Sequence, residues 1–247
     1  MSPTIGRARE LTRPDVSTEG PSRVLRRVLL AAGIGASLFY VIALVLGPMR
    51  WDGYSSIDQT VSELFAIDAP SRPLVVSLLF VSGVLSLAFG LGVLWSAGRN
   101  RALRVTGWAL VIVGVVDQAG PFFPMHMREV VAQGGGTFSD TMHVTLTIVL
   151  SLLFLISMAF GTVAFGKRSR VYSVATILTL LAFGAMASMQ AGALATNEPT
   201  PWQGVYERIN IAAYLMWMVV LAIVLLRAQR DATVGAVRDT PTGRQPA

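Results

Sequence analysis

Six long apolar segments, separated by short polar ones, dominate the pattern of hydrophobic and polar positions along this 247-residue chain. They cover residues 28–47, 74–95, 103–119, 142–165, 171–194 and 209–226. Each is close to the roughly 20 residues that an α-helix needs to cross a bilayer core about 30 Å thick. The third should stop or kink at Gly120-Pro121, because proline cannot donate the helical hydrogen bond. The pattern predicts an all-α polytopic membrane protein with six transmembrane helices.

The amino-acid composition indicates the same class of protein. Hydrophobic residues make up 53% of the chain and charged residues only 14%, and the mean hydropathy is +0.59. A soluble domain carries about 25% charged residues, so a soluble enzyme, a disordered chain and a nucleic-acid-binding domain are all excluded. The net charge of +6 comes from Lys and Arg in the short segments between apolar runs, where they set topology. Cysteine is absent, which excludes disulfides and Cys-ligated zinc.

Polar ends flank the membrane domain. Residues 1–23 and 229–247 show no apolar periodicity, so we predict two disordered cytoplasmic tails around a six-helix domain at 24–228. The first apolar run is too long for the core of a signal peptide and is predicted to be a membrane helix.

Basic residues are distributed unevenly between the two sides of this arrangement. Sixteen of the 20 Lys and Arg lie in the tails and in the second and fourth connections, and Arg50, Arg72, Arg128 and Arg208 lie on the other side. Positively charged segments stay in the cytoplasm. We therefore predict a plasma-membrane protein with both termini cytoplasmic. The three predicted outer loops, at 48–73, 120–141 and 195–206, are the longer ones, and long loops on a rigid scaffold often carry function.

The first outer loop contains the pattern Ser56-Ile-Asp-Gln59, which is typical of a capping box at the start of a helix. We expect a short helix from Ser56 to about Ala66, lying in the membrane interface. Gln59, Ser62 and Glu63 would share its polar face. These three residues either belong to a binding pocket or are simply solvated.

Two histidines and a carboxylate near the second outer loop are candidate metal ligands. Asp140 and His143 lie three residues apart on one face of the predicted fourth span, and His126 lies at the outer end of the third. Two His and one carboxylate can hold a divalent metal such as zinc in an open site. Alternatively, Asp140 stabilises the helix N-terminus and His143 makes a hydrogen bond within the bundle. No dense ligand motif such as His-Glu-x-x-His decides between the two.

Charged residues near the hydrocarbon boundary complete the candidate pocket. Asp117 lies in the outer third of its span, where an unpaired carboxylate is costly, and Arg208 is the nearest cation in depth. We expect Arg208 to turn inward and to pair with Glu63, Asp117 or Asp140. Glu207 precedes Arg208 and points about 100° away from it, so at least one of them faces the bundle. The full predicted pocket comprises Gln59, Ser62, Glu63, Asp117, His126, Asp140, His143, Glu207, Arg208 and Asn210.

Several short motifs occur in and beside the predicted outer loops. They are Gly53-Tyr54-Ser55, Gln59-x-x-Ser62-Glu63-Leu64, Ala69-Pro70-x-Arg72-Pro73, Phe123-Pro124-Met125, Asp140-x-x-His143 and Gly204-x-x-Glu207-Arg208-Ile209-Asn210. In this order they resemble the Domain of Unknown Function 998 family, six-span membrane proteins of bacteria and archaea. The resemblance covers about residues 28–226. It implies the six-helix fold and an outer polar site, and it implies no activity.

Two functions fit these observations. The first is binding of a lipid or small molecule in a polar pocket at the extracytoplasmic face, without catalysis. The second is a membrane-embedded, metal-assisted enzyme acting on a lipid or lipid-linked substrate at the outer leaflet, with carboxylate and His groups as general acid and base. The chain contains no Gly-x-Ser-x-Gly motif, which argues against ordinary serine hydrolysis. The expected partner is the lipid bilayer, and the pattern does not identify a substrate or an oligomeric state.

Overall fold

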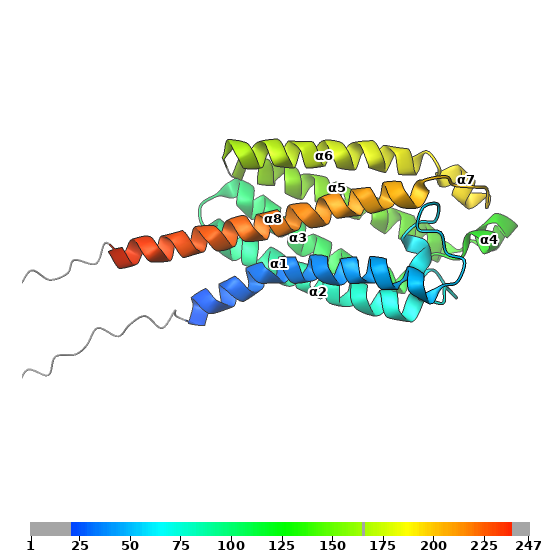
Figure 1. Ribbon diagram of the computed structural model, residues 1–247, viewed down its shortest axis with the longest axis horizontal. Coiled ribbons are helices and arrows are strands. Elements are labelled where there is room, and N and C mark those ends of the chain that lie inside the picture. Colours follow the sequence, from blue (N-terminus) through cyan, green and yellow to red (C-terminus); the bar gives the residue numbers. More distant parts are fainter. Residues whose placement is uncertain (1–20, 165, 239–247) are drawn as a thin grey trace, which may run out of the picture.

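The computed structural model describes residues 21–164 and 166–238, and this part of the chain is built from helices (Figure 1). Six of the described helices are long and apolar enough to span a membrane, which confirms the predicted all-α fold with six candidate spans. They are α1 Pro21–Leu46, α2 Arg72–Ala97, α3 Arg101–Asp117, α5 Phe138–Ala164, α6 Lys167–Ser188 and α8 Gln203–Arg238. Shorter helices lie in the connections: η1 Pro48–Arg50, η2 Ser62–Phe65, η3 Gly120–Phe122, α4 Arg128–Val130, η4 Val131–Gly135 and α7 Ala191–Ala195.

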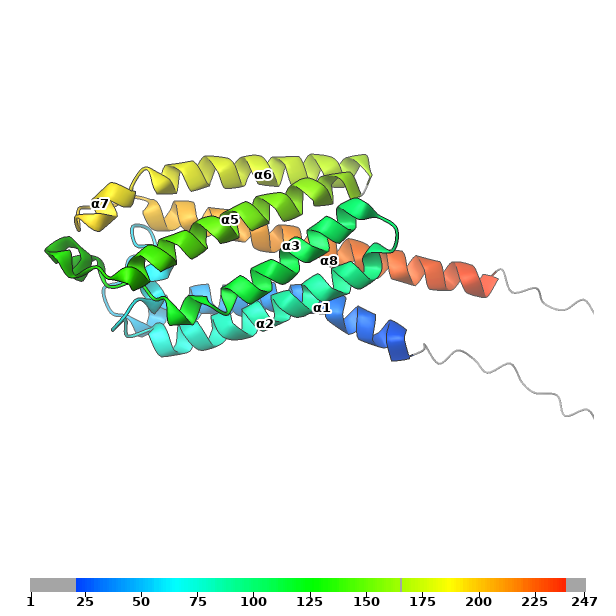
Figure 2. The same cartoon turned by 180° about the vertical axis from the view of Figure 1, so that it is seen from behind.

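The six long helices form one bundle in which each packs against its neighbours in the chain. α8 closes the ring, because it packs against both α6 and α1 (Figures 1 and 2). α1 begins and α8 ends at the same end of the bundle, here termed the terminal end. The three long connections, residues 47–71, 118–137 and 189–202, lie at the opposite end, here termed the loop end.

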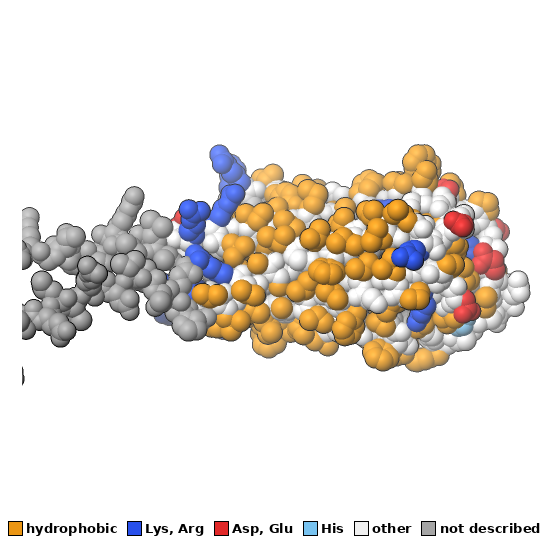
Figure 3. All heavy atoms as spheres, turned by 60° about the horizontal axis from the view of Figure 1, so that its bottom comes forward, with side chains coloured by type: hydrophobic (Ala, Val, Ile, Leu, Met, Phe, Trp, Pro, Cys, Tyr) orange, Lys and Arg blue, Asp and Glu red, His pale blue; other side chains and the backbone are white. Residues whose placement is uncertain are grey.

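Aromatic and aliphatic side chains fill the interior from the middle of the bundle to its terminal end. The rings of Phe154 on α5 and Tyr214 on α8 stack with centroids 3.7 Å apart, and Met158 is fully buried. Trp217 donates its indole N–H to Ser173 Oγ at 3.0 Å, which joins α8 to α6. Outside, hydrophobic side chains cover the middle of the bundle, while most visible Lys and Arg gather at the terminal end and Asp and Glu at the loop end (Figure 3). An apolar belt of this kind is what a bilayer core requires.

Two helix ends differ from the prediction, and a third agrees with it. α8 is helical through Arg238, so residues 229–238 are not a disordered tail; they extend a helix that is already formed and contain no proline that would end it. The apolar run at 171–194 is divided, because α6 ends at Ser188 and α7 follows separately. α3 ends at Asp117 and is followed by the turn η3, which confirms the predicted break at Gly120-Pro121. Residues 1–20 and 239–247, the rest of the predicted tails, lie outside the described residues.

The first long connection does not form the continuous helix expected at residues 56–66. Ser55 closes one turn instead: its Oγ accepts the backbone N–H of Asp58 (3.2 Å), and its own N–H donates to Gln59 Oε1 (2.9 Å). Only the four-residue η2 follows, and Glu63 within it is buried rather than solvated. Contacts with the rest of the loop end, described next, override the local helical pattern.

Candidate functional site at the loop end

Polar side chains from all three long connections meet the adjoining ends of α5 and α8 at the loop end. We term this group the loop-end cluster; its members are Tyr54, Gln59, Ser62, Glu63, Arg128, His143, Thr200, Glu207 and Arg208. Six of the ten predicted pocket residues belong to it. The other four, Asp117, His126, Asp140 and Asn210, lie elsewhere.

Glu63 and Arg128 form a buried, two-pronged ion pair. Arg128 Nε donates to Glu63 Oε1 at 2.7 Å, and Nη2 donates to Oε2 at 2.8 Å. The two side chains are only 2% and 10% exposed, respectively. Burial alone would raise the pKa of Glu63, but the hydrogen bonds and charge of Arg128, together with hydrogen bonds from Thr60 and Gln59, hold this pKa below its ordinary value. The hydrogen bond to Glu63 in turn raises the pKa of Arg128, so both groups are charged at neutral pH.

Thr200 links the ion pair to the third connection. Arg128 Nη1 donates to Thr200 Oγ1 at 3.2 Å, and the Thr200 hydroxyl donates to the carbonyl oxygen of Asp58 at 2.8 Å. The Asp58 carboxylate also accepts the backbone N–H of Trp202 at 3.2 Å. Three connections that are distant in the sequence are thus joined by side-chain hydrogen bonds, which hold the cluster in one arrangement.

The start of α8 holds the first connection from the other side. Glu207 Oε2 accepts the backbone N–H of Val61 at 2.6 Å. Arg208 donates to two carbonyl oxygens of the same connection and to the Tyr54 hydroxyl, the last at 2.8 Å. Gly204 permits this close approach, because a Cβ atom there would overlap backbone carbonyl oxygens of the first connection. Glu207 and Arg208 therefore both face the cluster.

The expected pairing of Arg208 with Glu63, Asp117 or Asp140 is wrong within the part of the chain that the structure describes. Arg208 does turn inward, but carbonyl oxygens and a hydroxyl satisfy its guanidinium. Glu63 takes Arg128 as its partner instead. Neutral backbone acceptors can satisfy a guanidinium fully, so depth in the membrane was an insufficient guide to charge pairing.

Tyr54 is a bridging residue that the sequence did not single out as part of the pocket. Its hydroxyl accepts from Arg208 and donates to the carbonyl oxygen of Thr60 at 2.7 Å. Burial raises the pKa of Tyr54 to about 12 although Arg208 opposes this shift, so the hydroxyl keeps its proton. Arg128 and Thr200 were likewise missed. Arg128 had one signal: it is among four basic residues on a side that carries nine acidic ones.

His126 and Asp140 form a separate hydrogen-bonded group within the second connection. Asp140 Oδ1 accepts the backbone N–H of His126 at 2.7 Å, and Oδ2 lies 2.8 Å from His126 Nδ1. Oδ2 also accepts the backbone N–H of Thr137 at 2.7 Å, which is half of a capping box at the start of α5. Asp140 therefore has the helix-terminus role that was the structural alternative.

His143 contacts a backbone carbonyl with one ring nitrogen and Ser62 with the other. Nδ1 lies 3.2 Å from the carbonyl oxygen of Phe123, and Nε2 lies 3.1 Å from Ser62 Oγ. A carbonyl oxygen can only accept, so Nδ1 carries the proton, and Nε2 of the neutral ring accepts from the Ser62 hydroxyl. The ring of Phe65 packs beside the imidazole, with centroids 5.7 Å apart.

The three candidate metal ligands are not brought together. His126 and Asp140 contact each other, while His143 uses both ring nitrogens elsewhere. Among residues 21–164 and 166–238, no three metal-ligating side chains form a group that could hold an ion. The donor geometry therefore matches the structural alternative more closely than a zinc site.

Asp117 and Asn210 lie outside the cluster. Asn210 Nδ2 donates to the carbonyl oxygen of Leu180 at 3.2 Å, which ties α8 to α6. Asp117 lies against Gly83 of α2, and it makes no hydrogen bond or ion pair with any described residue. Neither side chain shares a ligand site with the cluster.

The side chains on one face of α5 are buried in its terminal half and exposed in its loop half. Thr147 and Ser151 lie seven residues before Phe154 and Met158, so all four side chains share this face. Phe154 stacks on an aromatic ring of α8 and Met158 is fully buried, yet Thr147 and Ser151 are exposed. His143 lies one turn before Thr147 on the same face. We term this exposed part of the face, which lies one and two helical turns from His143, the α5 opening.

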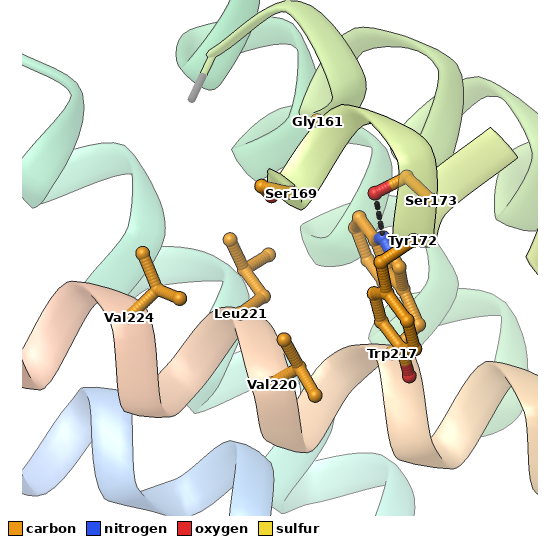
Figure 4. Close-up of a pocket in the computed structure, with 8 residues that line it drawn as sticks. All are labelled: Gly161, Ser169, Tyr172, Ser173, Trp217, Val220, Leu221 and Val224. Carbon is orange, nitrogen blue, oxygen red and sulfur yellow. Dashed lines mark hydrogen bonds between the residues drawn. The ribbon is translucent and has the colours of Figure 1, made fainter. Parts of the chain in front are cut away.

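A shallow pocket lies in the terminal half of the bundle, between α5, α6 and α8 (Figure 4). It is lined by Gly161, Ser169, Tyr172, Ser173, Trp217, Val220, Leu221 and Val224. This lining contains no carboxylate, imidazole or basic side chain, and the hydrogen bond between Trp217 and Ser173 lies on its wall. It is no larger than about one water molecule, so it offers neither space for an apolar chain nor groups for chemistry.

An apolar bundle of six helices long enough to cross a bilayer defines a multi-pass α-helical membrane protein, and its environment is lipid. Residues 22–224 match the model of the family described as Protein of unknown function (DUF998), and the protein belongs to this family. The match confirms the resemblance seen in the loop motifs. No curated protein and no solved structure matches the chain.

Proposed function

We propose that this is a plasma-membrane protein whose loop end faces outward and binds a polar head group, supplied by a lipid or by a small molecule at the membrane surface. The observation that carries the proposal is the α5 opening. Thr147 and Ser151 are exposed within the candidate span α5, and His143, one turn before Thr147, belongs to the loop-end cluster. A lipid entering sideways would bring its head group to the cluster while its chain stays among apolar helices.

The proposed orientation rests on charge. Sixteen of the 20 Lys and Arg belong to the segments of the terminal end, and the positive-inside tendency keeps such segments in the cytoplasm. Both termini would then be cytoplasmic and the loop end extracytoplasmic.

Unused hydrogen-bond capacity at the loop end also supports a polar ligand. The Oε1 atoms of Gln118, Gln190 and Gln203 are buried and have no partner among the described residues. Buried acceptors of this kind are normally satisfied by water or by a ligand. Gln190 and Gln203 lie at the third connection, where a head group with hydroxyl or amine donors would meet that need.

Native mass spectrometry of the purified protein tests this function. Thr147→Trp should fill the α5 opening and lower the occupancy of a co-purifying molecule about tenfold, whereas Thr145→Trp, on the other side of α5, should leave it unchanged. Organic extraction identifies a lipid and aqueous extraction a small polar molecule. Equal occupancy in both variants, or no bound species in the wild type, would contradict the proposal.

The alternative function is an enzyme that acts on a lipid at the outer leaflet. One observation favours it: the hydrogen bond between Ser62 and His143, which lies where the α5 opening ends. The donor geometry gives no support to a metal-assisted version of this enzyme.

A further inference from the structure

We infer that Ser62 and His143 form a nucleophile and general-base pair that hydrolyses an ester bond of a lipid, an activity that rests on the proposed lipid site. An activated serine needs a base within hydrogen-bond reach and a third group that orients the base. Ser62 Oγ lies 3.1 Å from His143 Nε2, and the Phe123 carbonyl oxygen lies 3.2 Å from Nδ1. The carbonyl takes the orienting role that a carboxylate has in other serine enzymes.

Other serines described at the loop end lack an imidazole partner, and Ser55 donates instead to the Asp58 carboxylate at 2.9 Å. Ser71 donates to the carbonyl oxygen of Leu64 at 2.6 Å, and Ser139 donates to that of Pro124 at 2.6 Å. A carbonyl oxygen is too weak a base to remove a hydroxyl proton, whereas a neutral imidazole is the usual acceptor in enzymes. Ser62 is thus distinguished by its partner rather than by a sequence motif.

Both members of the pair are accessible and firmly placed. Ser62 and His143 are each partly exposed, so a substrate can reach them. Ser62 is the first residue of η2, and the next residue, Glu63, is anchored by Arg128. His143 belongs to the long helix α5. A site on rigid elements keeps the nucleophile and the base at a productive distance.

The chemistry balances with water as the second reactant. Ser62 Oγ attacks the ester carbonyl carbon, and its proton passes to His143 Nε2. The bond from that carbon to the alcohol oxygen breaks, and the alcohol leaves with the proton from His143, which leaves an acyl ester on Ser62. Water then attacks the acyl carbon and gives a proton to His143, and Ser62 Oγ departs and takes that proton. One ester and one water yield one carboxylic acid and one alcohol.

The α5 opening determines the class of substrate. Thr147 lies one helical turn from His143 and Ser151 lies two turns away, both on the face that leads to the pair. An acyl chain lying along this face would place its ester carbonyl beside Ser62. We therefore assign a carboxylic ester with a long apolar chain, not a water-soluble ester.

The absence of native cysteine allows a direct test of the pair. Ser62→Cys creates a single-cysteine protein, and Ser139→Cys is its matched control. An imidazole partner stabilises a thiolate, so Ser62→Cys should react with iodoacetamide at neutral pH about tenfold faster than Ser139→Cys, and adding His143→Phe should abolish the difference. A fast rate that survives His143→Phe, or equal rates for the two cysteines, would overturn the assignment.

A long-chain alkyl fluorophosphonate tests the native serine. The wild type and Ser139→Ala should form an adduct that peptide mass spectrometry locates on Ser62, Ser62→Ala should form none, and His143→Phe should react about 100-fold more slowly. No adduct on Ser62 in a wild type that carries bound lipid would overturn the activity and leave the proposed lipid site intact. Failure of that site is recognised separately, by equal lipid occupancy in the Thr147→Trp and Thr145→Trp variants.

Discussion

Arg128→Met tests whether the Glu63–Arg128 ion pair holds the loop end together. Methionine retains a long apolar side chain but removes the guanidinium. Glu63 would keep its hydrogen bonds from Thr60 and Gln59, at 2.7–3.2 Å. It would lose the two from Arg128, at 2.7 and 2.8 Å, which are the ones that carry a full positive charge.

The expected loss is large because Glu63 is almost fully buried. Removing one partner of a buried ion pair leaves the other charge uncompensated, at a cost of about 3–5 kcal/mol in the free energy of unfolding. Arg128 supplies the largest of the effects that lower the pKa of Glu63, so its removal should shift this pKa upward from its wild-type position. The variant should therefore lose less stability at acidic pH, where the carboxyl group can be protonated, than at neutral pH.

Unfolding by SDS in mixed micelles, followed by tryptophan fluorescence, provides the measurement. Arg50→Met is the matched control, because Arg50 is an exposed arginine at the same end, and it should change the stability by less than about 0.5 kcal/mol. Combining Glu63→Gln with Arg128→Met removes both charges and should recover at least half of the loss. If Arg128→Met is no more harmful than Arg50→Met, the reasoning about a buried pair is refuted.

Three more outcomes follow from the loop end. The pKa of Glu63 is lower in the folded than in the unfolded state, so its contribution to stability is complete above about pH 4.5 and is lost as the pH falls through the folded pKa. Glu63→Gln should therefore make the unfolding midpoint depend less on pH in this acidic range. Val61→Asp should sharply reduce folded yield because Val61 is 2% exposed, while Ile57→Asp, at 50% exposure, should be tolerated; similar yields would contradict the position of the first connection. A reporter fused after Ala247 should be cytoplasmic and one inserted at Gly135 external, and finding both on one side would contradict the proposed orientation.

The sequence predicted part of the membership of the loop-end cluster but not its pairing. Polar motifs in and beside the loops pointed to Ser62, Glu63 and His143, which the structure brings into one cluster, since polar residues beside long apolar runs lie where the helices end. The partner of Glu63 is Arg128, 65 positions later in the chain, and the partner of His143 is Ser62, 81 positions earlier. No spacing rule reaches across such separations, because the distance between two loops depends on how the helices beneath them pack.

Helical periodicity also failed in the first connection. The pattern from Ser56 onward fits a surface helix with Glu63 on its polar face, but Glu63 is buried and only η2 forms. The backbone N–H of Val61 donates to Glu207 instead of to a helical carbonyl, and Arg128 donates to the buried Glu63 side chain. These partners lie on other elements, so local propensity could not anticipate them.

Hydropathy along the chain is enough to establish six spans and an all-helical fold, because a lipid-exposed backbone must satisfy its own hydrogen bonds and about 20 apolar residues suffice to cross the core. The same local information concentrates basic residues at one end. The ring of helices then decides what no local pattern contains: that Arg128 rather than Arg208 neutralises Glu63, and that His143 meets Ser62 rather than a metal ligand set. Ion pairs and hydrogen bonds require atoms from different elements to meet within about 3 Å, and only the packing of those elements brings them that close.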